Sequence, residues 1–336
     1  MRALSGIVDG ARDRALGGAR VLITGGVGFI GSRLALRLVG DGAQVTVLDA
    51  SLPESGANDF NLMAVADRLT IIRGDVRDVS VLRQSVRDQA VLFNMAGLTS
   101  HVDSLRAPHD DLDVNYRAQL GIVDACLAVN PAIRIVHAST RQVYGVPDGL
   151  PVAESHPVRP PDPNGINKYA AELWYQLNAR LHGLRVTSLR LTNTYGPHMR
   201  VRDARQTFLG LWIARAVADE QFEVWGGEQV RDFTFVDDVV DACCRVASLD
   251  DCGGVFNVGG PASSLRELAN LITQVAGSGS YVVKQYDDDR RAIDIGSYVA
   301  DDGALRKATG WSPRTSLREG IERTVEFYRE NVARYV

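Results

Sequence analysis

Short runs of apolar and β-branched residues alternate with segments of helical periodicity through the first half of the chain. Such runs are typical of strands in a parallel sheet, and the segments between them are typical of the helices that cover it. The alternation predicts an α/β fold with a doubly wound parallel sheet, whose ligands bind at the carboxyl ends of the strands. The predicted strands are 20–24, 44–49, 69–73, 90–94, 133–138 and 185–191, and the predicted helices are 29–40, about 112–129 and about 165–182.

The pattern loosens after residue 193, where a polar, arginine-rich loop begins. Because no repeat or low-complexity linker separates the halves, we interpret the second half as a lobe of the same unit. We predict a tail over 1–18, a first domain over 19–193 with a return segment at about 231–260, and a smaller, discontinuous C-terminal lobe over 194–230 and 261–336. Within the second half, helices are expected at 206–219, 264–276 and 316–333 and a strand at 221–225, whereas no element is predicted for 51–68.

Three glycines, Gly25, Gly28 and Gly31, join the first predicted strand to the first helix. Because glycine has no Cβ atom, they permit a tight turn and a close approach of the backbone to a pyrophosphate at a helix N-terminus. Glycines also occur in ordinary turns, but here Asp49 ends the next strand, where a carboxylate can bind the ribose hydroxyls of an adenosine. The sequence therefore predicts a Rossmann-type dinucleotide site.

The residues after Asp49 favour NAD over NADP. Ala50 and Ser51 follow it, so the 2′-phosphate of NADP would meet a negative charge and no cationic partner. Two further segments follow predicted strands: residues 74–76 could hold an adenine edge, and the small residues of 94–97 would let the cofactor run close.

Composition describes a soluble globular protein of 336 residues, with 45% hydrophobic and 23% charged residues and a net charge of −4. The chain has no excess of basic residues that would indicate nucleic-acid binding, and no apolar run of ~18 residues that would indicate a membrane span. Residues 1–18 lack the apolar core of a secretory signal. The four cysteines show no metal-binding spacing, so we expect no metal site and a reducing, cytoplasmic compartment.

Several motifs then occur in one order along residues 20–325. They are the segments 24–31, 74–78, 94–97, 138–145, 190–197, 231–238 and 310–313, with Asn115, Asn167, Lys168 and Glu172. In this order they resemble the extended short-chain dehydrogenase/reductase family, in its nucleotide-sugar epimerase, dehydratase and decarboxylase branch. The resemblance implies tightly held NAD, transient oxidation of a sugar carbon, usually C4, and return of the hydride. It also implies a UDP- or dTDP-sugar as substrate and a homodimer built on the helices near 112–129 and 165–182.

The resemblance implies catalytic roles for Thr140 and Lys168. The hydroxyl of Thr140 would hydrogen-bond the substrate oxygen that loses its proton, and the ammonium of Lys168 would bind the nicotinamide ribose. A strand-end hydroxyl and a helix-surface lysine are the ordinary alternatives. Lysine is rare in this chain, however: of 37 basic residues only Lys168, Lys284 and Lys307 are lysines, which favours a specific need for an ammonium at position 168.

The tyrosine that the family carries four residues before this lysine is missing, and Asn164 stands there. An amide cannot take up a proton at pH 7. We predict that Asn164 positions substrate, cofactor or water, and that the proton leaves through Thr140 to another acceptor. His101 is the candidate, because it follows the fourth predicted strand and an imidazole has a reference pKa of ~6.5.

The cofactor-binding residues predicted in this way are Gly25, Gly28, Phe29, Ile30, Gly31, Asp49, Asp75, Val76, Met95, Ala96, Gly97, Asn115 and Lys168. The predicted substrate-binding residues are Thr99, Arg141, Gln142, Asn193, Arg200, Arg205, Arg231, Arg291 and Asp294. Arg141 and Gln142 stand where the resembling 4,6-dehydratases carry an Asp-Glu pair, which disfavours ordinary dehydration. The arginines of 200–205 lie where related enzymes cover the sugar, and in glucuronate decarboxylases such an arginine belongs to the acid-sugar site; a plain surface loop is the alternative.

We therefore predict an NAD-dependent, epimerase-like enzyme that acts on a nucleotide sugar through an atypical active site. A decarboxylase or an unusual dehydratase is one alternative, and a non-catalytic protein that binds NAD and a nucleotide sugar is another. The nucleotide, the sugar and the stereocentre stay open at this stage.

Overall fold

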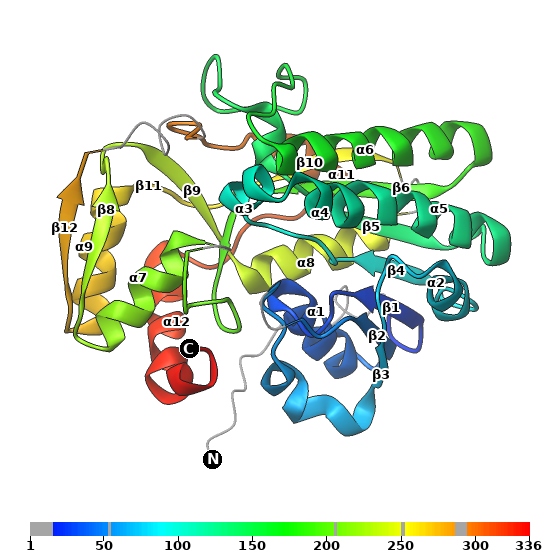
Figure 1. The fold of residues 1–336 in the computed structure, drawn as a ribbon, viewed down its shortest axis with the longest axis horizontal. Coiled ribbons are helices and arrows are strands. Elements are labelled where there is room, and N and C mark those ends of the chain that lie inside the picture. Colours follow the sequence, from blue (N-terminus) through cyan, green and yellow to red (C-terminus); the bar gives the residue numbers. More distant parts are fainter. Residues whose placement is uncertain (1–15, 53–54, 205–206, 250–252, 286–293) are drawn as a thin grey trace.

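The computed structural model describes residues 16–52, 55–204, 207–249, 253–285 and 294–336. A seven-stranded sheet forms the larger part of the fold, with parallel neighbours in the order β10-β6-β5-β4-β1-β2-β3 (Figure 1). The prediction of a doubly wound parallel sheet is thus confirmed. The strands are β1 (Arg20–Thr24), β2 (Gln44–Asp49), β3 (Thr70–Arg73), β4 (Val91–Asn94), β5 (Arg134–Thr140), β6 (Arg185–Leu191) and β10 (Gly254–Val258).

Helices cover both faces of this sheet, α1 and α8 on one face and α2, α5 and α6 on the other (Figure 1). The segment predicted as a helix over about 112–129 is helical throughout, but the helical stretch begins earlier and is not continuous α-helix. The chain turns helical at α4, passes through a π-helical turn (Asp113–Arg117), and continues as α5, an extra residue in one turn that apolar periodicity does not reveal. The helices are α1 (Phe29–Gly40), α2 (Val79–Ser85), α3 (His101–Arg106), α4 (Pro108–Leu112), α5 (Ala118–Val129), α6 (Pro163–His182), α8 (Val236–Ala247) and α11 (Gly303–Thr309), and residues 51–68, left without an element above, hold a 3₁₀ segment (Asp59–Arg68).

A smaller lobe lies beside the carboxyl ends of the main strands, on the left of Figure 1. Its three-stranded sheet has the order β11-β9-β7, and β8 pairs with β12. The chain leaves the main sheet after β6 and rejoins it only at α8 and β10, so β9 belongs to the lobe. The elements are β7 (Asn193–Tyr195), α7 (Phe208–Val217), β8 (Gln221–Trp225), β9 (Val230–Phe235), β11 (Ala262–Ser264), α9 (Leu265–Ala276), β12 (Ser280–Lys284) and α12 (Leu317–Asn331).

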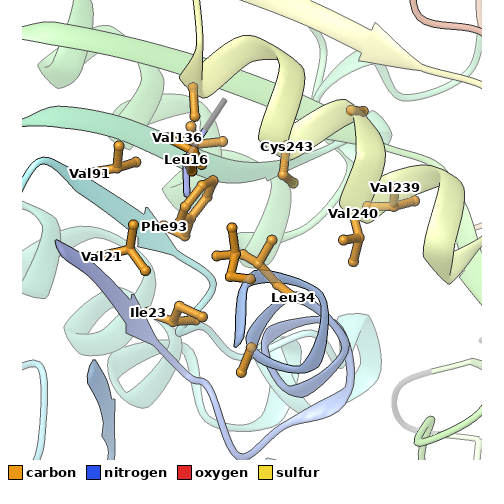
Figure 2. Packing of buried hydrophobic residues seen from close by; sticks show 14 of the residues in the cluster. Leu16, Val21, Ile23, Leu34, Val91, Phe93, Val136, Val239, Val240 and Cys243 are labelled. Carbon is orange, nitrogen blue, oxygen red and sulfur yellow. The ribbon is translucent and has the colours of Figure 1, made fainter. Parts of the chain in front are cut away.

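The main core holds the strands in register. Val21 and Ile23 of β1 and Phe93 of β4 are fully buried and pack against Leu34 of α1 and Cys243 of α8 (Figure 2). Burial of each such side chain stabilises the fold by about 1.5–3 kcal/mol. The strand order reverses between β1 and β4, so the carboxyl ends of these two strands open a crevice, which is where ligands of such sheets bind.

Within the described residues, no helix combines the length and the apolar character needed to cross a bilayer. The same residues contain no group of three or more His, Cys, Asp or Glu side chains placed to hold a metal ion.

Candidate active site

A cavity of about 1110 Å³ runs along the carboxyl ends of β1, β4, β5 and β6 and reaches the smaller lobe. Asn115 and Arg200 are not on its wall, and Arg205 and Arg291 lie outside the described residues. The other predicted site residues line it: Gly25, Gly28, Phe29, Ile30, Gly31, Asp49, Asp75, Val76, Met95, Ala96, Gly97, Thr99, His101, Thr140, Arg141, Gln142, Asn164, Lys168, Asn193, Arg231 and Asp294.

The glycine turn at one end of the cavity fits a dinucleotide. Gly25 has φ +68°, and a Cβ atom there would lie 2.8 Å from the backbone nitrogen of Ala96 on the neighbouring strand end. Gly28 precedes α1, and no side chain caps this helix and no acidic residue lies in its first turn. Its free N–H groups and positive dipole end therefore remain open to a pyrophosphate.

Asp49, at the end of β2, fixes this turn as well as facing the cavity. Its Oδ2 accepts a hydrogen bond from Val27 N at 2.9 Å, and its Oδ1 accepts one from Ser51 N at 2.7 Å. The fold also brings Arg73 of β3 beside Asp49, which the sequence did not indicate. The guanidinium of Arg73 is already bound to Ser51 and to Asp59, the latter at 2.8 Å.

Lys168 reaches the middle of the cavity from α6. Its Nζ donates to Ala138 O at 3.0 Å, and a Cβ atom on Gly97 would lie 2.7 Å from Nζ. Burial lowers the pKa of Lys168 to about 8, although the charges of Asp111 and Glu172 oppose the shift. The ammonium thus lies directly against Gly97, in the middle of the loop after β4.

Asn164 lies one turn before Lys168, and its amide is used inside the protein. Its Nδ2 donates to Leu98 O at 2.8 Å and to Asp111 Oδ2 at 2.9 Å. Asn115 and Asn167 also donate to Asp111, at 2.9 and 2.8 Å, so three amides surround one buried carboxylate. Sequence reasoning missed Asp111, because Asn164 and Asn167 lie 53 and 56 residues away in the chain and no local pattern indicates that they meet it.

Asn115, predicted to bind the cofactor, lies behind the wall instead. It accepts from Leu98 N at 3.2 Å and donates to Leu98 O at 3.0 Å. Its place in the π-helical turn brings the side chain onto the loop after β4, so it shapes that loop from behind.

Thr140 is the last residue of β5, and hydrogen bonds around it fix this strand end. Its Oγ1 accepts from Gln142 N at 3.1 Å and begins the 3₁₀ turn Arg141–Tyr144. Below it, the fully buried Glu172 accepts hydrogen bonds from Arg190, the shortest from Nη2 at 2.6 Å. This buried ion pair joins β6 to α6, and Ser139 of β5 also donates to Glu172, so the ends of both strands are fixed against α6.

Two buried arginines lie at the far end of the cavity. Arg141, 9% exposed, donates to Asn193 Oδ1 at 3.2 Å, and Arg231 forms an ion pair with Asp294. Burial, followed by the charge of Arg231, lowers the pKa of Arg141 to about 10, so it stays charged at neutral pH. Among the described residues Arg141 has no carboxylate partner within ion-pair distance, and this end can accept an anionic group.

Of the predicted substrate-binding arginines in the loop 200–205, the structure describes Arg200 but not Arg205. Arg200 bonds to Asp203, with Nε at 2.7 Å from Oδ1, and borders a separate surface hollow beside His198 and Tyr335. Arg200 is buried, 7% exposed, and is not part of the wall of the main cavity.

A comparison with known protein families identifies the family of this chain. The model of the NAD dependent epimerase/dehydratase family matches residues 21–259. The chain belongs to this family. It is 31% identical to a UDP-glucose 4-epimerase of Mycolicibacterium smegmatis, over 92% of this chain and 98% of the other. It is 34% identical to a dTDP-glucose 4,6-dehydratase of Streptomyces niveus, over 94% of each. The solved structure of UDP-glucose 4-epimerase from Thermotoga maritima with UDP-glucose has a TM-score of 0.85 and 28% identity, over 93% of this chain and 99% of that one.

Membership of the epimerase/dehydratase family confirms the predicted cofactor, NAD, and the class of enzyme. The glycine turn, Asp49 and Lys168 form a wall that fits NAD on geometry alone. The chain differs from the resemblance at the residue that would accept the proton. Asn164 stands where the tyrosine is expected, and its amide is already bonded to Asp111 and Leu98.

Proposed function

We propose that this protein interconverts nucleotide-diphosphate sugars, with UDP or dTDP as the nucleotide, by oxidising one sugar carbon, C4, and reducing it again from the other face. The observation that carries the proposal is the single cavity, which joins the dinucleotide wall to Thr140 and Lys168 and then to a cationic end. The names of the relatives support the two nucleotides. A cytoplasmic location is part of the proposal, and it fits the described cysteines, Cys126, Cys243 and Cys244, which form no disulfide.

Different residues of the chain would bind the cofactor, bind the substrate and assist the reaction. Bound NAD would accept a hydride from the sugar carbon and give it back. The N–H groups at the start of α1 would hold the pyrophosphate, Asp49 the adenosine ribose and Lys168 the nicotinamide ribose. Thr140 would hydrogen-bond the sugar hydroxyl that is oxidised, and Arg231 with Asn193 would bind the substrate diphosphate.

One observation favours a second candidate, conversion of an acidic sugar with loss of CO₂. Arg141 is a buried cation that directly follows Thr140 and lacks a carboxylate partner among the described residues. A carboxylate on the sugar would supply that partner. Arg141 and Gln142 cannot act as the acid and base of an ordinary dehydration at neutral pH.

The test is product analysis of the purified protein, after native mass spectrometry has measured retained NAD. We expect NAD in the wild-type protein and conversion of at least one of UDP-glucose, UDP-glucuronic acid and dTDP-glucose into its C4 epimer, detected by chromatography and NMR. Release of CO₂ and a pentose product from UDP-glucuronic acid would favour the second candidate. Retained NAD and tight sugar-nucleotide binding without any product would contradict an enzyme and support a binding protein.

We further propose that the protein is a homodimer formed through α5 and α6, which pack side by side on one face of the sheet. Ile166, Leu173 and Leu181 of α6 are 51%, 47% and 61% exposed, and their spacing places them on one side of the helix. Light scattering at micromolar concentration is expected to give twice the chain mass of 36.5 kDa. Leu173→Glu should shift the mass toward the monomer, and a wild-type monomer would refute the proposal.

A further inference from the structure

The proposed reaction needs a group that takes the proton from the oxidised hydroxyl, and Asn164 cannot be that group. We infer that His101 and Asp162 form this proton-accepting pair, with His101 as the catalytic residue and Asp162 as the residue that positions it. The inference rests on the proposed function, since it assigns a step of that reaction.

The pair is built from two helix starts. His101 is the first residue of α3, is about one-third exposed and lies on the cavity wall. Its Nδ1 lies 3.0 Å from Oδ2 of Asp162, whose side chain is fully buried. The N–H is not yet in line for a hydrogen bond, as is common in catalytic pairs before substrate binds. Sequence reasoning had named His101 alone, although Asp162 before Pro163 carries the signature of a helix N-cap.

Asp162 is held rigidly and remains ionised. Its Oδ1 accepts from Gly165 N at 2.8 Å, which caps α6, and its Oδ2 accepts from Gln142 Nε2 at 2.8 Å. Burial raises the pKa of Asp162, but His101 and these two donors outweigh burial, so the pKa is lowered overall. An anion fixed beside Nδ1 favours the imidazole tautomer with hydrogen on Nδ1, and it leaves Nε2 free to accept a proton.

Gln142 links this pair to Thr140. Its backbone N–H donates to Thr140 Oγ1 at 3.1 Å, and its side-chain amide donates to Asp162. The same 3₁₀ turn therefore sets both the hydroxyl and the carboxylate behind the imidazole. The α6 helix that Asp162 caps also carries Lys168, so the residue that positions His101 and the residue proposed to hold the cofactor lie on one helix.

The step conserves protons and electrons. With bound NAD as the hydride acceptor, the hydroxyl on the oxidised sugar carbon would give its proton to Thr140 Oγ1, and the hydroxyl proton of Thr140 would pass to Nε2 of His101. Asp162 stabilises the resulting imidazolium through Nδ1–H. When the hydride returns, His101 gives the proton back along the same path, and no further oxidant or acid is needed.

The experiment measures turnover, retained NAD and sugar-nucleotide binding in His101→Ala and Asp162→Asn, with the sugar nucleotide that the wild-type protein converts. We expect kcat to fall by about 10²–10⁴-fold in His101→Ala, with retained NAD unchanged, because general-base help is worth that range. Added imidazole should restore part of the rate, which a merely structural role would not allow. Asparagine keeps the helix cap at position 162, so Asp162→Asn should fold normally.

Asp162→Asn should lose turnover for a different reason. The amide of the new asparagine would donate to Nδ1 of His101, which favours the imidazole tautomer with hydrogen on Nε2, and that nitrogen then cannot accept a proton. Nitrogen-15 NMR of histidine-labelled, NAD-loaded protein is expected to show Nδ1–H for His101 in the wild type and Nε2–H in Asp162→Asn. His109→Ala is the matched control, because His109 is exposed on α4 away from the cavity wall.

Normal turnover in His101→Ala would overturn the inference while leaving the proposed function intact. A loss that imidazole does not relieve and that comes with loss of NAD would also overturn it, since the side chain would then be structural. If the wild-type protein converts no sugar nucleotide, the proposed function fails, and the pair loses its role with it.

Discussion

Replacing Lys168 by methionine is expected to weaken NAD retention by about 10–100-fold and to reduce turnover with it, since a hydrogen bond from a charged group contributes about 1.5–3 kcal/mol. Methionine preserves the length of the side chain and removes the charge. In the structure Nζ lies against Gly97 and donates to Ala138 O on the wall of the cavity. The measurement is the ratio of NAD to protein after dialysis, by native mass spectrometry.

The same position should give a pH dependence. Because burial lowers the pKa of Lys168 to about 8, the ammonium loses its proton at lower pH than an ordinary lysine. The contribution of its charge to NAD binding should therefore be present below about pH 8 and fall as the pH rises through that value. Lys168→Met should show no such step.

The chain offers two matched controls, Lys284 and Lys307, the other two lysines, which are both exposed. Their methionine variants should retain NAD as the wild type does. Equal loss of NAD in all three variants, or unchanged retention in Lys168→Met, would contradict the role given to Lys168.

Asn164→Tyr, which restores the residue expected from the resemblance, is predicted to reduce turnover by at least about 10²-fold, because small misplacements near the reacting atoms cost that much. Asn164 is 2% exposed, and one amide nitrogen serves both Leu98 and Asp111. A phenol has a single O–H and a larger ring, so it cannot satisfy both acceptors, and the loop after β4 must move.

NAD should stay bound in this variant, since Lys168 and the glycine turn are unchanged. Asn164→Ala is the control that removes the same two hydrogen bonds without adding bulk, and it should lose less activity than the tyrosine variant. Steady-state kinetics with the converted sugar nucleotide measures both. A rate above wild type in Asn164→Tyr would mean that this active site is a weakened form of the ordinary one, and it would refute a pocket reshaped around the amide.

The cofactor half of the site was accessible to sequence reasoning because its chemistry is local. Gly25, Gly28 and Gly31 lie within one strand–turn–helix unit, and Asp49 ends the adjacent strand. Short-range sterics and hydrophobic periodicity fix such units, and all four residues line the cavity.

The elements that sequence reasoning missed or misplaced are the short or irregular ones. Strands β7 and β11 have three residues each, too few for a period to show. In the π-helical turn, the side chain of Asn115 bonds to Leu98 and lies off the cavity wall, and no local pattern of apolar residues reveals such a turn.

By itself, the sequence determined the doubly wound sheet, the dinucleotide turn, the preference for NAD and the absence of a tyrosine before Lys168. Only the tertiary structure decided which side chains surround the position where that tyrosine is missing. It brought Asp162 to His101, gathered three amides around Asp111 and left Arg141 buried without a carboxylate partner among the described residues. The physical reason is that most of these contacts join side chains far apart in the chain, and their energies depend on burial and distance that no local pattern encodes.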